Sequence, residues 1–214
     1  MNRLKNATIT WTRKVGSIDQ LEEIYGKPSP ASIIKEIDYI SKEYQKFIEA
    51  SPFAVLATVG EEGLDCSPRG DPPGFVQVSD RKTVLLPDRR GNNRLDSLRN
   101  LVRDPRCSLL FLIPGVGETI RINGTAELVI DYALRENFII QGKAPALVIV
   151  VTVERIYFQC PKALVRSQLW DPKSQIPRSA IPTTGEMIRG VHDENFDAEA
   201  YDKAYPERLS DTIY

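Results

Sequence analysis

The sequence has only one histidine, His192, among its 214 residues. A histidine-rich metal site is therefore excluded. A Ser-His-Asp or Cys-His arrangement would have to use His192, which lies in the polar stretch 190–197. We interpret His192 as a solvated loop residue, and we expect neither a metal site nor a catalytic side chain. If the protein is an enzyme, a bound cofactor carries the chemistry.

Cysteine is also scarce. Cys66, Cys107 and Cys160 are odd in number and widely spaced, and no CxxC pair occurs. This pattern gives no support to a zinc site or a thioredoxin-like motif. We interpret the three residues as reduced thiols that pack as small hydrophobes.

Long apolar runs and an excess of charge are absent as well. The longest purely apolar run, 146–151, is far shorter than the roughly 20 residues of a membrane-spanning helix. No apolar segment typical of a secretory signal follows Met1, so we expect a cytoplasmic protein without a membrane partner. The formal net charge of −1 argues against nucleic-acid binding, which needs a basic excess.

Residues 1–52 are predicted to form an N-terminal helical extension. Ser17 and Gln20 have capping-box spacing at the start of a first helix, and Gly26 ends it. A second, longer helix is predicted after Pro30 and is ended by Ser51-Pro52. Its apolar residues recur at steps of three or four: Ile33, Ile37, Ile40, Tyr44, Phe47 and Ile48.

The sequence pattern changes in residues 53–170, where we expect a run of about six strands that is interrupted by short helices. The expected strands are 53–59, 64–67, 75–78, 83–86, 107–113, 119–130 and 147–158, and the expected helices are 92–104, 131–141 and 161–170. Asn123-Gly124 fits either a hairpin turn or a bulge within one long strand. The order is not a βαβ alternation. It favours a mainly β fold with peripheral helices, a mostly antiparallel barrel. Residues 171–214 form a tail that packs on the barrel or on a partner subunit.

The segment 86–97 joins a buried strand to a helix N-terminus. Such a terminus exposes free N–H groups, and guanidinium groups beside it match the oxygens of a phosphate. The alternative is a solvated charged turn. The candidate phosphate ligands are Arg89, Arg90, Asn92, Asn93, Arg94 and Ser97.

A second polar cluster, 67–74, lies between two predicted strands. Arg69 can reach an anionic group there, and Asp71 can orient it. The alternative is an ordinary Pro/Gly loop with an internal Arg–Asp pair, which contributes roughly 0–1 kcal/mol when exposed.

Five segments in this order resemble the pyridoxamine 5'-phosphate oxidase-related family of FMN-binding split barrels. They are FAVLATVGEEG (53–63), DCSPRGDPPGF (65–75), TVLLPDRRGNNRLDSLRNL (83–101), DPRCSLLFLIPG (104–115) and ETIRINGTAEL (118–128). The resemblance implies a six-stranded antiparallel split β-barrel that forms a homodimer, with FMN at sites on the subunit interface.

The resemblance also implies roles for individual residues. The strand-to-helix turn, with Asp88 at its start, would hold the FMN phosphate. Ser67 and Arg69 would line the isoalloxazine or ribityl side, and Arg121 would lie under the cofactor. The segment 162–170 looks like the element that closes the site from the second subunit, with Arg166, Ser167 and Trp170. The family's Arg-Leu-His-Asp-Arg substrate motif is missing, since Arg208-Leu209 is followed by Ser210 and Asp211. Pyridoxamine phosphate is therefore not the expected substrate.

Three functions are consistent with this pattern. The first is an FMN-dependent oxidoreductase that acts on a small molecule or accepts electrons from a nicotinamide donor. The second is a non-catalytic flavin-binding or redox-sensing protein. The third is a split barrel that binds another cofactor, either a deazaflavin or haem, and the single histidine speaks against histidine-ligated haem.

Overall fold

The computed structural model describes residues 13–61 and 63–214, and the chain divides into two units, residues 1–35 and 36–214. The described part of the first unit holds helices α1 (Ile18–Tyr25) and α2 (Pro30–Ile34). The Ser17 side chain accepts a hydrogen bond from the Gln20 N–H at 3.2 Å, so the predicted start of α1 is confirmed. Gly26, with φ of 73°, ends α1 as expected.

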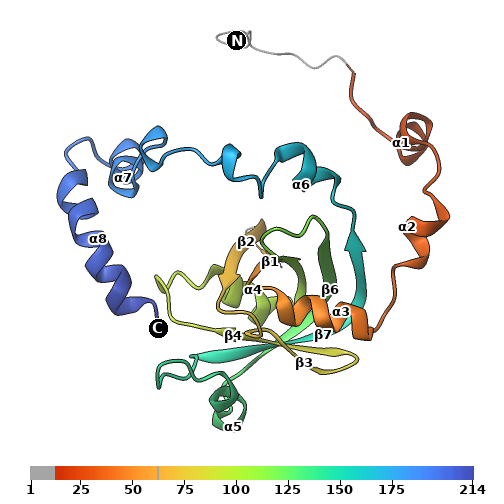
Figure 1. The fold of residues 1–214 in the computed structure, drawn as a ribbon, viewed down its shortest axis with the longest axis horizontal. Coiled ribbons are helices and arrows are strands. Elements are labelled where there is room, and N and C mark those ends of the chain that lie inside the picture. The colour runs from red at the N-terminus through yellow and green to blue at the C-terminus, as the bar shows by residue number, and fades with distance from the viewer. Residues whose placement is uncertain (1–12, 62) are drawn as a thin grey trace. The chain divides into compact units, whose positions relative to one another are not determined.

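The second unit is built on one seven-stranded antiparallel sheet (Figure 1). Its strands lie in the order β2-β1-β5-β6-β7-β4-β3, so β2 and β3 are edges and the sheet is open. The expectation of a mainly antiparallel β fold is confirmed, with seven strands rather than six. Their bounds are β1 Phe53–Gly60, β2 Gly63–Gly70, β3 Gln77–Asp80, β4 Thr83–Asp88, β5 Arg106–Leu112, β6 Thr119–Val129 and β7 Leu147–Gln159.

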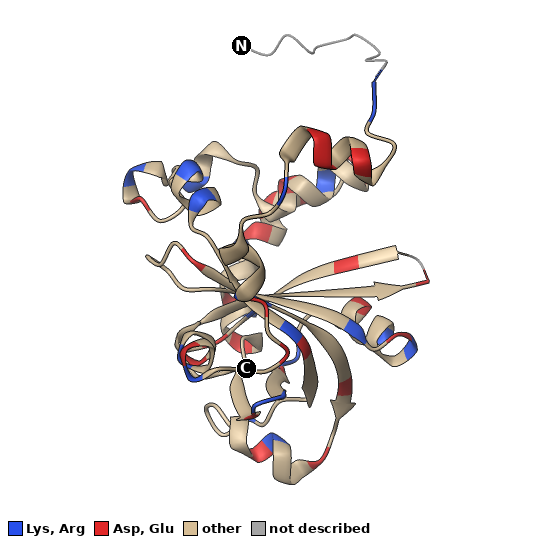
Figure 2. Ribbon diagram, turned by 90° about the vertical axis from the view of Figure 1, so that its right-hand side faces the viewer, with Lys and Arg blue, Asp and Glu red and all other residues tan. Residues whose placement is uncertain are grey.

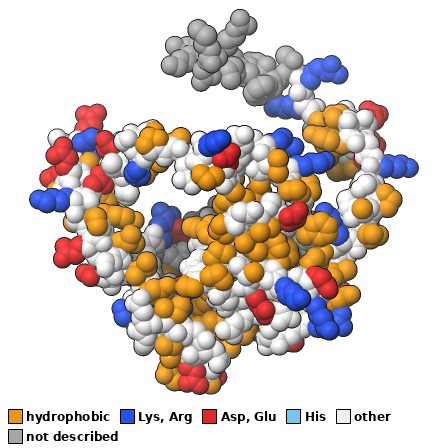
Figure 3. Space-filling view, in the orientation of Figure 1, with side chains coloured by type: hydrophobic (Ala, Val, Ile, Leu, Met, Phe, Trp, Pro, Cys, Tyr) orange, Lys and Arg blue, Asp and Glu red, His pale blue; other side chains and the backbone are white. Residues whose placement is uncertain are grey.

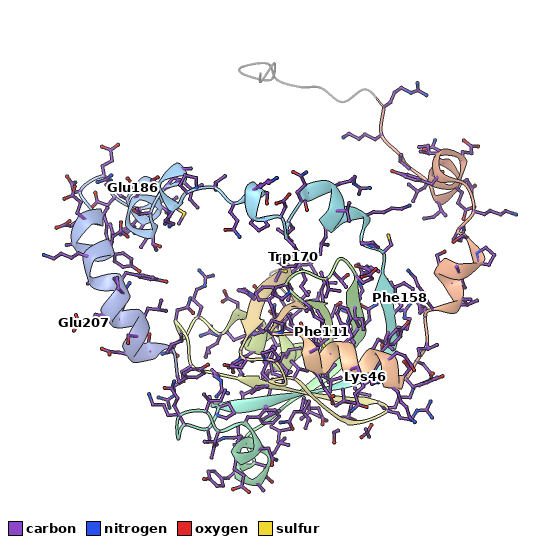
Figure 4. All side chains as sticks on the ribbon, in the orientation of Figure 1. Lys46, Phe111, Phe158, Trp170, Glu186 and Glu207 are labelled. Carbon is purple, nitrogen blue, oxygen red and sulfur yellow. The ribbon has the colours of Figure 1, made fainter. Side chains whose placement is uncertain are left out.

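The core is built on one face of this twisted sheet, whose strands diverge in the side view of Figure 2. Alternate residues of β1 are buried, and their partners across β5 and β6 are buried too. Phe111 of β5 is fully buried and lies among the strands in Figure 4. Helix α3 (Lys42–Ala50) adds Ile48 to the same core, and α4 (Asp96–Arg103) adds Leu101.

The remaining helices are short and lie in loops or in the C-terminal segment. None of the described helices is long and apolar enough to cross a bilayer. Their bounds are α5 Tyr132–Arg135, η1 Glu136–Phe138, α6 Lys162–Ser167, η2 Pro172–Ser174, η3 Arg178–Ala180, α7 Thr184–Val191 and α8 Ala198–Thr212.

The long helix predicted for residues 30–51 is wrong, because the structure breaks it into α2 and α3. The backbone of Ile37 instead pairs with Ile156 of β7, with N–O distances of 3.1 and 2.8 Å. Ser41 then begins α3, since its side chain accepts a hydrogen bond from the Tyr44 N–H at 3.2 Å. Pairing with the sheet has overridden the apolar helical pattern.

Two strands extend further than the sequence predicted, and each extension runs through a proline. Strand β2 continues through Pro68 to Gly70, where the sequence suggested a loop, because β2 is an edge strand with one side free of partners. Strand β4 continues through Pro87, which pairs with Val148 of β7. Pro87 lies beyond Leu85, the last residue of β4 that pairs with β3.

Asn123-Gly124 forms a bulge within β6, which decides between the two alternatives. The register with β7 shifts between Asn123 and Gly124. A Cβ at Gly124 would lie 2.0 Å from the backbone oxygen of Thr152. Position 124 therefore has no room for a side chain, which explains the glycine.

Replacing Gly124 by alanine is expected to lower the free energy of unfolding by about 1–3 kcal/mol, the usual cost of overpacking. Urea denaturation would measure the change. Gly190→Ala in α7 is the matched control, because a Cβ there meets nothing within 4 Å. Equal stability of the two variants would contradict the steric account of the bulge.

Candidate functional site

A pocket of about 290 Å³ lies between edge strand β2, the end of β4 and the start of α4; we call it the β2–α4 pocket. It combines three arginines with three carboxylates, two hydroxyls and two amides. The lining residues are Asp65, Ser67, Arg69, Asp88, Arg89, Gly91, Asn92, Asn93, Arg94, Leu95, Asp96, Ser97 and Leu98.

Strand β2 supplies three polar side chains to this pocket by simple alternation. Asp65, Ser67 and Arg69 pair with Thr58, Leu56 and Ala54 of β1, all of which are buried. Paired residues point to the same face of a sheet, so the polar side chains of β2 lie on its core side. On this face of the sheet, the edge strand β2 therefore presents polar side chains, whereas the neighbouring strands present core residues.

Arg69 and Asp88 form an ion pair at the inner wall of the pocket, with Arg69 Nη1 donating to Asp88 Oδ1. Burial raises the pKa of Asp88 above its ordinary value of 3.8, and the Arg69 guanidinium opposes part of that rise. Arg69 Nε is fully buried and has no hydrogen-bond partner among the described residues. A buried donor without a partner is costly, so this N–H is a strong candidate to bind a ligand.

The Asp88 carboxyl should contribute to the pH dependence of the free energy of unfolding. Its folded pKa lies above 3.8, so between 3.8 and that pKa the folded chain holds a proton that the unfolded chain has released. The contribution of Asp88 to stability therefore falls as pH rises through this window. Denaturation at a series of pH values should show that Asp88→Asn removes this component, and parallel curves for the variant and the wild type would contradict it.

The start of α4 has an irregular backbone. Asn93 and Leu95 are both left-handed, with φ of 59° and 63°. The Arg94 N–H donates to Asn92 Oδ1 at 3.1 Å. The predicted helix 92–104 therefore begins only at Asp96, and residues 92–95 form a loop over the pocket. The first N–H groups of the helix lack partners within it and are available to an anion.

Hydroxyl groups link this helix to β2. Ser97 is buried, and its Oγ lies 2.9 Å from Ser67 Oγ and donates to Asp65 Oδ2. Arg94 is mostly exposed, and its Nε donates to Asp96 Oδ2 at 2.8 Å. Asp65 was missed at the sequence level, although its two-residue spacing from Ser67 and Arg69 could have revealed it.

Arg89 has partners other than the Arg69–Asp88 ion pair. Its Nε donates to Asp71, and its Nη2 donates to the Phe138 carbonyl at 3.1 Å. Asp71 therefore orients Arg89 rather than Arg69, for which the sequence suggested it. Each of the two buried arginines has its own carboxylate.

Five of the expected ligands lie elsewhere in the single chain. Arg90 lines a neighbouring pocket. Arg121 is on the other face of the sheet, where its Nη1 donates to Tyr157 Oη at 2.9 Å. Arg166 and Ser167 are exposed at the end of α6, and Trp170 Nε1 donates to the Val116 carbonyl at 2.8 Å. Within one chain, these residues do not join the β2–α4 pocket.

No group of three or more His, Cys, Asp or Glu side chains suited to a metal ion occurs in the described ranges. The chemistry that the β2–α4 pocket offers is the binding of an anion by arginine, hydroxyl, amide and backbone donors.

Comparison with known proteins identifies the family of the chain. The chain is similar in fold to HupZ of Group A Streptococcus, with 21% identity and a TM-score of 0.45 over 55% of this chain and 91% of that chain. It is also similar to a FAD-binding protein of Mesorhizobium loti, with 15% identity and a TM-score of 0.40 over 54% and 89% of the two chains. No curated protein matches the chain significantly. The family model described as pyridoxamine 5'-phosphate oxidase matches residues 40–160, more than half of the sequence, and the chain therefore belongs to that family.

Proposed function

We propose that the protein binds FMN, with the phosphate in the β2–α4 pocket, and that it is a flavin-dependent oxidoreductase acting on a small molecule. The observation that carries the proposal is the buried Nε of Arg69, which has no partner among the described residues. A phosphate oxygen at this point would satisfy the donor with a charge-assisted hydrogen bond.

The donor set fits a phosphate despite the three carboxylates in the pocket. Each guanidinium has five N–H donors, and the hydrogen bonds of Arg69 and Arg94 to carboxylates use one donor each. The carboxylates orient the arginines and leave their other donors free. Ser67, Asn92, Asn93 and the first N–H groups of α4 add neutral donors around the same space.

The chain's own residues would bind and orient the cofactor. FMN, when bound, supplies hydride transfer. Asp88 would hold the Arg69 guanidinium in place, and Ser97 would fix the start of α4 against β2 through Asp65 and Ser67. The lack of a histidine near the pocket is consistent with chemistry carried by the cofactor.

The decisive experiment is a visible absorption spectrum of the purified protein, followed by heat release and identification of the chromophore. Flavin bands and released FMN would support the proposal, whereas a colourless protein that takes up no added FMN would overturn it. Release of a deazaflavin or of haem would favour the alternative cofactors. Turnover with NADH or NADPH and an acceptor then separates an oxidoreductase from a non-catalytic flavin-binding protein.

We further propose that the protein is a homodimer that buries the outer face of β1, β2 and β5. The side chains on this face are largely apolar. Figure 3 shows that hydrophobic side chains are also exposed at the centre of the surface in its view. Leu64 is 88% exposed, although it lies on a strand. A contiguous exposed apolar face of this kind is typical of a protein–protein interface. Its members are Phe53, Val55, Ala57, Val59, Leu64, Cys66, Pro68, Leu110 and Leu112.

The three cysteines give a direct test of this interface. Cys66 is on the proposed interface, Cys160 is exposed outside it, and Cys107 is buried with its pKa raised to about 12. Iodoacetamide should therefore modify Cys160 alone in the dimer, and Cys160 and Cys66 in a diluted monomer. Peptide mass spectrometry would identify the sites, and rapid modification of Cys66 in the dimer would exclude this face.

A further inference from the structure

A second, larger pocket of about 600 Å³ lies beside the β2–α4 pocket; we call it the basic pocket. It is formed by the start of the β4–α4 loop, the segment between η1 and β7, and the end of α8. Four of its side chains are cationic and one is acidic. The lining residues are Arg89, Arg90, Gly91, Asn93, Arg135, Lys143, Ala144, Pro145, Ala146, Asp211, Thr212 and Tyr214.

Two of these cations, Arg90 and Arg135, have no carboxylate partner in the described part of the chain. Arg135 donates to the carbonyls of Pro145 and Ile130 at 3.0 and 3.3 Å. Lys143 Nζ is held by the backbone oxygen of Tyr214 at 2.6 Å. Arg90 is exposed, and no ion pair to it is found among these residues. Carbonyl groups fix the direction of a cation but leave its charge uncompensated.

The β2–α4 pocket is different, because each of its arginines pairs with a carboxylate. Arg69 pairs with Asp88, Arg89 with Asp71 and Arg94 with Asp96. Arg90 and Arg135 therefore leave positive charge without a carboxylate partner in the basic pocket, where Asp211 is the one acidic side chain among the lining residues. A concave site of one sign attracts a ligand of the opposite sign.

Tyr214 gives the basic pocket an aromatic wall. Its hydroxyl donates to Asp71 Oδ1 at 2.8 Å, and the Arg89 guanidinium carbon lies 5.2 Å from its ring centroid. The hydrogen bond to Asp71 raises the pKa of the Tyr214 hydroxyl, so the ring stays neutral. The pocket thus combines cationic groups with an apolar surface, which suits an organic anion better than a bare ion.

The two pockets are adjacent, because Arg89, Gly91 and Asn93 line both of them. A molecule in the basic pocket would lie next to a cofactor whose phosphate occupies the β2–α4 pocket. We propose that the basic pocket binds the carboxylate or phosphate group of the organic substrate, through Arg90, Arg135 and Lys143. This assignment of substrate class rests on the proposed function.

Isothermal titration with inorganic phosphate and with succinate tests the basic pocket without a need for turnover. The variant Arg90→Gln/Lys143→Gln removes two charges, and Lys42→Gln/Lys46→Gln on α3 is the control with the same change in net charge. We expect the first variant to bind both probes at least tenfold more weakly than the wild type, and the control to bind them within twofold. Equal binding by the two variants would overturn the proposal.

Two further arms identify the source of the anion and separate this proposal from the proposed function. Flavin fluorescence with FMN tests the β2–α4 pocket: loss of FMN binding with intact phosphate binding would overturn the flavin function and leave the basic pocket as an anion site. Titration with FAD tests whether the anion in the basic pocket belongs to a dinucleotide cofactor rather than to a substrate. If FAD binds far more tightly than FMN, and only with Arg90 and Lys143 present, the second phosphate of a dinucleotide occupies the pocket and the substrate assignment is wrong.

Discussion

Replacing Arg69 by glutamine should weaken FMN binding by about 10- to 150-fold, which corresponds to the 1.5–3 kcal/mol typical of a hydrogen bond to a charged group. Arg69 is expected to dominate because its side chain is only 19% exposed and its Nε lacks a partner among the described residues. Glutamine keeps part of the length of the side chain but removes the charge and the buried Nε donor.

Quenching of flavin fluorescence on titration of the apoprotein would measure this affinity. Arg103→Gln is the matched control, because Arg103 is exposed at the far end of α4 and does not line the β2–α4 pocket. Arg94→Gln should have a smaller effect than Arg69→Gln, since the Arg94 side chain is 75% exposed and already pairs with Asp96 in solvent. An affinity of the Arg69 variant within twofold of the wild type would remove this residue from the phosphate site.

Much of this fold could be predicted from local patterns. The short apolar runs 53–59 and 107–113 predicted β1 and β5, and the turn residues at 60–63 predicted the hairpin between β1 and β2. These signals are local, because a short apolar run bounded by turn residues is typical of a buried strand. The long helix 30–51 failed for the opposite reason: the backbone pairing of Ile37 with Ile156 joins positions 119 residues apart (156 minus 37).

The polar lining of the β2–α4 pocket was predictable in part. Ser67, Arg69, Asp88, Arg89, Asn92, Asn93, Arg94 and Ser97 all line one pocket, as the two polar clusters suggested. The ion-pair partners were not predictable, because Arg69 and Arg89 lie 19 and 18 residues from the carboxylates that they contact. Tyr214 was missed entirely, since its contact with Asp71 spans 143 residues.

The Arg69–Asp88 pair is costly to bury, and this cost bears on its role. Burial raises the pKa of Asp88 even though a guanidinium contacts it, so desolvation outweighs the attraction of Arg69. A buried ion pair of this kind is weak evidence for stability. Its retention is consistent with a need for a positioned guanidinium at the wall of the β2–α4 pocket, where Asp88 holds Arg69.

Asp88→Ala should therefore destabilise the fold by about 3–5 kcal/mol, because it leaves Arg69 buried without its carboxylate. The double variant Arg69→Met/Asp88→Leu should recover most of that loss, since two apolar side chains of similar volume need no partner. Urea denaturation would compare the two. The double variant should still bind FMN at least tenfold more weakly than the wild type, as Arg69→Gln does, which would separate binding from folding. A double variant that is as unstable as Asp88→Ala would show that the pair stabilises the sheet, and one that binds FMN with unchanged affinity would exclude Arg69 from the phosphate site.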